Sequence, residues 1–127
     1  MTEVGDPSAG RYVRQVLLRE VGAAGQARVA AAHVVVTGQG VAARVCALYL
    51  AGAGVGRLTV SGPLIDDVRS LNPEVDVRAA RGRARSFDAY IGAEQTAVAV
   101  PRTGRPVDDG AAVALAALKR LLQDARS

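Results

Sequence analysis

A short glycine-rich segment, Gly38-Gln39-Gly40, has residue types and spacing that can bind a phosphate group. In turns of this kind the first glycine lets the chain reverse tightly. The second lets a phosphate approach the backbone at the positive N-terminus of the following helix. The third glycine of this GxGxxG-like pattern is replaced by Ala43, a small residue that such sites also accept. The pattern is a weak signal by itself, so it predicts a phosphate ligand only between a strand and a helix.

The segments on either side of the glycine turn supply this context. Residues 33–37 (HVVVT) form a continuous apolar run, which predicts a parallel-sheet strand that is buried on both faces. Residues 41–53 predict a helix that ends at Gly54, and residues 57–60 predict a second strand. Because crossover connections are right-handed, the two strands are expected to be parallel. This is the β-α-β opening of a nucleotide-binding fold.

The remaining residues predict further strands and helices around this unit. They comprise a short helix or turn over 11–19, a break over 21–25, a helix over 26–32, a helical turn over 66–71, strands over 74–78, 87–91 and 96–100, and a helix over 110–123. Asp108 and Asp109 precede the last helix, where carboxylates can cap its N-terminus. The sequence therefore predicts an α/β protein with a truncated, Rossmann-like three-layer fold and a mostly parallel sheet of four or five strands.

Length and composition indicate a single domain. The 127 residues are enough to bury a core, and we expect a flexible tail over 1–10 followed by one domain over 11–127. Half of the residues are apolar and only 3% are aromatic, so the core must consist of Val, Leu and Ala. The sequence shows no secretory signal and no apolar run of membrane-spanning length, which predicts a cytoplasmic protein without membrane contact.

Two residues with reactive side chains have simple structural interpretations. Cys46 is the single cysteine, which excludes an intrachain disulfide and a cysteine-based zinc cluster. Because Cys46 lies within an apolar helix, we expect a buried core residue rather than a nucleophile. His33 has no acidic or cysteine partner in a recognisable motif, so we expect a histidine at a strand edge. No metal site is predicted.

Positive charge is concentrated in one predicted loop. The net charge is +4 and the isoelectric point is about 10.0, with Lys119 as the one lysine. Four arginines lie between Arg78 and Arg85, where they could bind nucleic acid or an acidic partner. The loop lacks interleaved aromatic residues, so a solvated loop is the favoured interpretation and nucleic-acid binding is not expected.

Residues 11–60 resemble the start of the ThiF/MoeB/HesA family, the bacterial relatives of ubiquitin-activating enzymes. The similar segments are RYVRQVLLREVGAAGQARV over 11–29, HVVVTGQG over 33–40 and VCALYLAGAGVGRLTV over 45–60. Shorter likenesses follow in LNPEV over 71–75 and in GAAVALAALKRLL over 110–122. The first block is specific, whereas the later matches are short.

The resemblance implies a site and a reaction. Family members use ATP and magnesium to adenylate the C-terminal glycine of a ubiquitin-like sulfur carrier. By resemblance, Gly38 and Gly40 would face the ATP phosphates. Arg14 matches an arginine that reaches into the partner's ATP site in family dimers, and a salt bridge that anchors the N-terminal segment is the equal alternative. Arg11 and Tyr12 match the same segment in a structural role.

The chain departs from the family at the positions that bind the rest of the nucleotide. The family's aspartate after the second strand falls at Gly62, the next acidic position falls at Leu64, and Asp66 and Asp67 come a few residues late. A family segment with an arginine and a glutamine, followed by a lysine, contacts phosphates. It has no room in the ten residues between 60 and 71. The magnesium-binding aspartate has no clear counterpart, because Asp88 falls at the start of its predicted strand. The family's CxxC zinc pairs are also missing.

Three hypotheses about function follow. Adenylation depends on positive charge and metal at the triphosphate, so these losses favour a degenerate, non-catalytic remnant of the adenylyltransferase. It would act as a scaffold or partner subunit, in a homodimer or with a full-length ThiF-like protein, and a ubiquitin-like sulfur carrier is a further candidate partner. The alternative is a minimal ATP-binding adenylating enzyme or nucleotide sensor. The second alternative is a binder of nucleic acid or an acidic partner through the 78–85 loop.

Overall fold

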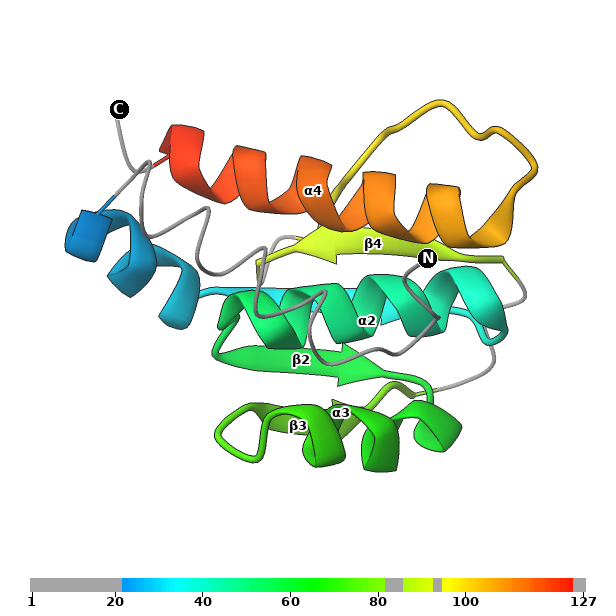
Figure 1. Ribbon diagram of the computed structural model, residues 1–127, viewed down its shortest axis with the longest axis horizontal. Helices are drawn as coiled ribbons and strands as arrows, with labels where there is room; N and C mark the ends of the chain where they lie inside the picture. Colours follow the sequence, from blue (N-terminus) through cyan, green and yellow to red (C-terminus); the bar gives the residue numbers. More distant parts are fainter. Residues whose placement is uncertain (1–21, 82–85, 93–94, 125–127) are drawn as a thin grey trace.

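The computed structural model describes residues 22–81, 86–92 and 95–124 (Figure 1). Residues 22–30 are helical. The elements that follow are β1 (His33–Thr37), α2 (Val41–Ala53), β2 (Arg57–Val60), the 3-10 turn η1 (Gly62–Leu64), α3 (Ile65–Leu71), β3 (Asp76–Ala79), β4 (Asp88–Ile91), β5 (Thr96–Ala97) and α4 (Pro106–Asp124). The predictions for residues 1–21 lie outside the described residues. None of the described helices is long and apolar enough to cross a membrane.

The five strands form one sheet in the order β3-β2-β1-β4-β5. Strands β1, β2 and β3 are parallel to one another, which confirms the parallel direction predicted for the first two. Strand β4 pairs antiparallel with β1, and β5 pairs antiparallel with β4. The predicted α/β class, with a mostly parallel sheet of four or five strands, is therefore confirmed.

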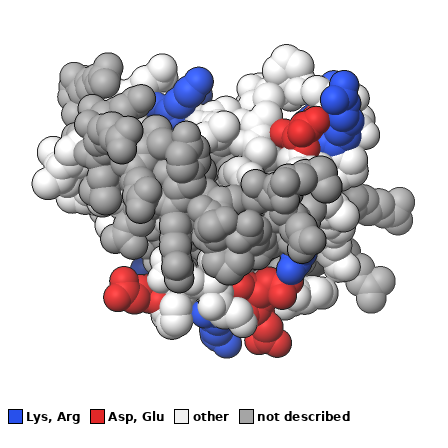
Figure 2. All heavy atoms as spheres, viewed as in Figure 1, with Lys and Arg blue, Asp and Glu red and all other residues white. Residues whose placement is uncertain are grey.

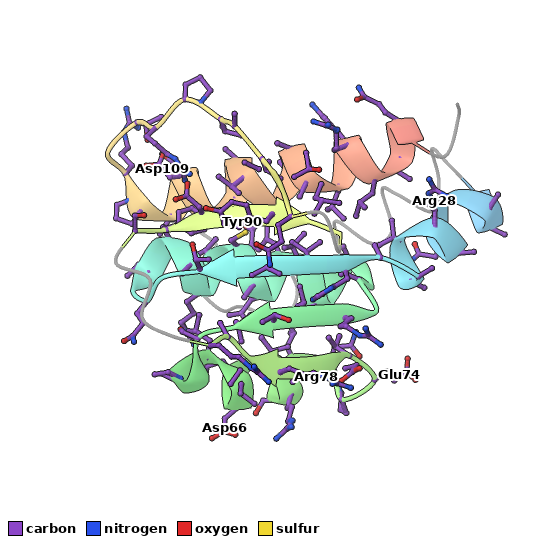
Figure 3. The ribbon with its side chains drawn as sticks, turned by 180° about the vertical axis from the view of Figure 1, so that it is seen from behind. Arg28, Asp66, Glu74, Arg78, Tyr90 and Asp109 are labelled. Carbon is purple, nitrogen blue, oxygen red and sulfur yellow. The ribbon has the colours of Figure 1, made fainter. Side chains whose placement is uncertain are left out.

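Helices α2, α3 and α4 form one layer on one face of the sheet. Helix α2 packs between the other two helices, α3 also contacts β3, and α4 also contacts β4. Figure 1 shows this layer in front of the strands, and Figure 3 shows the sheet from the other side. The described residues therefore form two of the three predicted layers.

The expected burial of residues 33–37 on both faces is wrong. Val34 and Val36 are fully buried beneath the helices, whereas His33, Val35 and Thr37 are only partly buried. The same alternation continues in β2, where Leu58 and Val60 are buried. The reason is that the described helices cover one face of the sheet, so each strand has one buried and one accessible side.

Several predicted boundaries also need correction. The 21–25 break is wrong for residues 22–25, which are helical. Strand β3 begins at Asp76 rather than at residue 74, β4 begins at Asp88, and the predicted 96–100 strand shortens to the two residues of β5. By contrast, α2 ends as predicted at Gly54, which adopts the left-handed conformation with φ 97°.

Helix α4 begins four residues before its predicted start, because Pro106 fits the first turn of a helix. Asp109 therefore lies inside the first turn and binds back to the preceding loop. Its carboxylate accepts the N–H and the hydroxyl of Thr103, each at 2.8 Å, and the N–H of Gly104 at 3.2 Å. These hydrogen bonds, that from the Thr103 N–H first, lower the pKa of Asp109.

We expect Asp109→Asn to destabilise the protein at pH 7 by an amount that shrinks in acid. A lowered native pKa contributes stability above the unfolded value of about 3.8, and this contribution is lost as pH falls through the native pKa. Urea denaturation of both proteins from about pH 7 to about pH 2.5 measures the difference. A difference that stays constant in the acid part of this range would contradict this role for the carboxylate.

Candidate functional site

The glycine turn lies at the carboxyl edge of the parallel strands, between the end of β1 and the start of α2. Helix α4 begins at the same edge, and β2 leads there into η1 and α3 (Figure 1). In open α/β sheets, ligands bind at this edge where the strand order reverses. Here the reversal lies at β1, which has β2 on one side and β4 on the other.

Gly38 is required by the backbone itself. Its φ of 85° is in the left-handed region, and a Cβ at this position would lie 2.8 Å from the carbonyl oxygen of Ser86. The chain that enters β4 therefore passes directly against the turn. Both constraints disfavour any residue with a side chain at this position.

Gly40 stands before α2 with open space around it among the described residues. It is the N-cap residue with φ 97° and ψ −171°, no described side chain caps the helix, and no described atom lies within 4 Å of a Cβ built there. The N–H groups of the first helical turn have no partner within the helix. A phosphate could bind them, as the sequence predicts for this position. Gln39 is exposed next to this space, whereas Ala43 is fully buried and packs in the core.

The positions after β2 do not reproduce a ribose site. No described atom lies close to a Cβ built on Gly62, and Asp66 is exposed on α3. The carboxylate of Asp67 accepts a hydrogen bond from Nε of Arg44 at 3.0 Å, which joins α3 to α2. The hydroxyl of Ser61 is buried and has no hydrogen-bond partner among the described residues.

Asp88 lies at the same edge as the glycine turn, which the sequence analysis did not foresee. A parallel strand would have placed its first residue at the opposite edge. Because β4 is antiparallel, Asp88 is instead paired with Thr37, the residue before Gly38. The Asp88 N–H donates to the Thr37 hydroxyl at 3.1 Å, and that hydroxyl lies 3.1 Å from the Ser86 carbonyl oxygen.

Arg102 is a second residue at this edge that the sequence analysis missed. Its guanidinium donates to the Asp88 carboxylate at 3.1 Å and to the Phe87 carbonyl at 3.2 Å, and it lies 4.7 Å from the centre of the Phe87 ring. The Ser86 hydroxyl donates to the other Asp88 oxygen at 3.2 Å. Arg102 follows β5 in an irregular loop, so no local sequence pattern indicates that it reaches β4.

The carboxylates of Asp67, Asp88 and Asp109 at this edge therefore already form ion pairs or hydrogen bonds within the protein. Asp67 pairs with Arg44, Asp88 pairs with Arg102, and Asp109 binds the loop before α4. No group of three metal-ligating side chains occurs within residues 22–81, 86–92 and 95–124. On the face drawn in Figure 2, the described acidic and basic side chains lie next to one another rather than in separate patches.

Cys46 and His33, the two residues with reactive side chains, lie away from this edge. Cys46 is fully buried, as expected, and burial raises the pKa of its thiol. His33 begins β1 at the opposite edge, where Nε2 lies 2.9 Å from the Thr59 hydroxyl. Burial, followed by the charge of Arg57, lowers the pKa of His33.

The structure describes only part of the basic loop over residues 78–85 and does not describe Arg11, Tyr12 and Arg14. Arg78 donates to both carboxylate oxygens of Asp76, at 3.3 and 3.4 Å. Arg83 and Arg85 lie outside the described residues, as do Arg11, Tyr12 and Arg14 of the N-terminal segment.

Comparisons with known proteins identify relatives of part of the chain. The mouse adenylyltransferase and sulfurtransferase MOCS3 is 42% identical over 84 residues, which are 64% of this chain and 18% of that protein. The adenylyltransferase and sulfurtransferase uba4 of Aspergillus terreus is 40% identical over 87 residues, 68% of this chain and 18% of that protein. The heterocyst protein HesA of Trichormus variabilis is 54% identical over 48 residues, 38% of this chain and 18% of its own length. The chain thus spans less than a fifth of each of these relatives. No protein-family model and no solved structure matches it.

Proposed function

This chain is related to the ThiF/MoeB/HesA family over part of its length, and from that relationship we propose that it is a non-catalytic member that acts by binding another protein. It would keep the frame of an ATP-dependent adenylyltransferase for sulfur carriers without the groups that perform the transfer.

The ion pairs that Asp67 and Asp88 form with arginines are the main support for this proposal. Adenylation needs a metal ion and cationic groups at the triphosphate, with an anchor for the ribose. Here Arg102 neutralises Asp88, and Arg44 neutralises Asp67. A carboxylate held by arginine is a poor magnesium ligand, because binding the ion would require breaking the ion pair.

We base the proposed partner on the resemblance of the N-terminal segment to the family. The proposed partners are a second copy of this chain or a ThiF-like adenylyltransferase, and a ubiquitin-like sulfur carrier is a further candidate. Arg14 is the residue through which this chain would contribute to a partner's nucleotide site. Co-purification with a ThiF-like protein, compared between the natural chain and Arg14→Ala, tests this assignment.

The second candidate is a nucleotide-binding protein, and Gly40 favours it. The open space at Gly40 and the uncapped first turn of α2 among the described residues fit a phosphate. In this case ATP would bind through its phosphates to the backbone around residues 38–41. The carboxylate that usually holds the ribose has no counterpart at Gly62, which predicts weaker binding than in a complete site.

We expect the purified protein to show no ATP–pyrophosphate exchange with magnesium and a sulfur-carrier protein, and no calorimetric heat at millimolar ATP. Gly40→Val tests the phosphate position. Gly92→Val is the matched control, because Gly92 also has a left-handed φ (74°) and no described atom near a Cβ built there, but lies at the other edge of the sheet. Exchange activity, or micromolar ATP binding that Gly40→Val abolishes and Gly92→Val retains, would overturn the non-catalytic proposal in favour of the second candidate.

A further inference from the structure

Four polar residues lie side by side near the start of β1, β2 and β3. The strand register pairs His33 with Arg57, and Arg57 with Asp76. Paired residues on neighbouring strands point to the same face of a sheet, and this is the face away from α2, α3 and α4, because Val34 faces the helices. Arg78 comes two residues after Asp76 and points to the same face (Figure 3). We call His33, Arg57, Asp76 and Arg78 the amino-edge cluster.

Two guanidinium groups share one carboxylate in the amino-edge cluster. Nε of Arg57 donates to Oδ2 of Asp76 at 3.2 Å, and Nε of Arg78 donates to Oδ1 at 3.3 Å. Both carboxylate oxygens therefore already accept hydrogen bonds from arginine. While His33 is neutral, the cluster has a single excess positive charge, and protonation of His33 would add a second one beside it.

The other described elements around His33 supply no negative charge that would compensate an imidazolium. Nε2 of His33 lies 2.9 Å from the hydroxyl of Thr59, which is neutral. The helix over 22–30 carries Arg28, which is exposed and positive (Figure 3). The charged residue of β4 is Asp88, which is paired with Thr37 at the other end of β1. His33 is also partly buried, so its charged form would lose part of its hydration.

We propose that the amino-edge cluster makes the sheet sensitive to mild acid, because the folded protein accommodates a neutral His33 better than an imidazolium. Since burial and then Arg57 lower the pKa of His33 in the folded protein, the unfolded protein binds a proton first as the pH falls below about 6.5. Stability is therefore lost between that value and the lower native pKa of His33. This range lies above the one in which Asp109 titrates, and the inference goes beyond the proposed function because it needs no partner.

Proton NMR of the whole chain tests the proposal, because His33 is the one histidine and its Cε1–H resonance reports its titration directly. The titration runs from about pH 8 to about pH 4.5, once in buffer and once in concentrated urea. We expect a lower pKa in the folded protein than in urea. Arg57→Gln and Arg78→Gln should each raise the native pKa of His33, because each removes a positive charge. Arg69→Gln is the matched control and should leave it unchanged, because Arg69 is exposed on α3, on the other face of the sheet.

Urea denaturation connects this titration to the stability of the fold. Between about pH 7.5 and about pH 5 the natural protein should lose stability relative to His33→Asn, whose side chain stays uncharged. In this comparison the ratio of folded to unfolded natural protein should fall by a factor that approaches the ratio of the two measured acid dissociation constants of His33 and does not exceed it.

Three results would overturn the proposal. The first is a pKa of His33 in the folded protein that equals or exceeds the pKa in urea, a result that needs no variant. The second is an equal loss of stability by the natural protein and His33→Asn between the two pH values. The third is a native pKa that stays unchanged in both Arg57→Gln and Arg78→Gln, which would remove the amino-edge cluster as the cause.

Discussion

Replacing Gly56 with alanine is expected to reduce the free energy of unfolding by about 3 kcal/mol or more, the upper end of the range for overpacking. A Cβ at Gly56 would overlap the Ala30 carbonyl oxygen, at the end of the 22–30 helix. Neither the backbone at Gly56 nor the end of the 22–30 helix can move freely. The Gly56 carbonyl accepts the Asp76 N–H at 2.9 Å, and the next residue, Arg57, donates to the Ala32 carbonyl at 3.1 Å. Making room would break the start of both β2 and β3.

Urea denaturation followed by circular dichroism measures this effect. The matched control is Gly62→Ala, because no described atom lies within 4 Å of a Cβ built on Gly62 and its backbone does not need a left-handed φ. We expect the control to change the free energy of unfolding by less than about 0.5 kcal/mol. If Gly56→Ala is as stable as the control, the close approach between the helix and β2 is wrong.

Gly110→Ala is the second substitution with a large expected effect. We expect it to destabilise the protein, whereas the same substitution at an ordinary helix position stabilises it. Glycine to alanine in an exposed helix interior stabilises by about 0.5–1 kcal/mol. Gly110, however, lies where α4 crosses α2, and a Cβ there would meet the Ala42 carbonyl oxygen and, at 2.9 Å, the Val45 Cβ. The two helices would have to separate over their contact. We therefore expect a net loss of about 2 kcal/mol.

Thermal and urea denaturation of Gly110→Ala show whether the substitution raises or lowers the free energy of unfolding. Gln123→Ala, at an exposed position late in the same helix, is the control for helix propensity and should stay within about 0.5 kcal/mol of the natural protein. Adding Val45→Ala removes the γ-carbons but leaves the Ala42 carbonyl in place, so the double variant should remain destabilised. A stabilised Gly110→Ala would show that α2 and α4 do not pack this closely.

These two glycines illustrate which parts of the fold local patterns can predict. The presence of a strand at residues 33–37, the turn at Gly38 and the left-handed end of α2 at Gly54 depend on neighbouring residues, and the structure confirms them. Gly56 and Gly110 are constrained by residues far away in the sequence, at Ala30 and Ala42. No local pattern distinguishes such a glycine from one that merely ends a helix or opens a loop.

The sequence by itself determined the β-α-β unit, the α/β class and the resemblance to the ThiF/MoeB/HesA family, which the relatives at about 40% identity confirm for part of the chain. These features depend on hydrophobic periodicity and glycine positions within about thirty residues. Only the tertiary structure decided the direction of β4, because strand direction depends on which neighbour and which edge the chain reaches. That direction places Asp88 beside the glycine turn, where it forms an ion pair with Arg102. The tertiary structure also places α2, α3 and α4 on the same side of the sheet. Long-range packing, rather than local pattern, therefore decided which charged residues surround the candidate site.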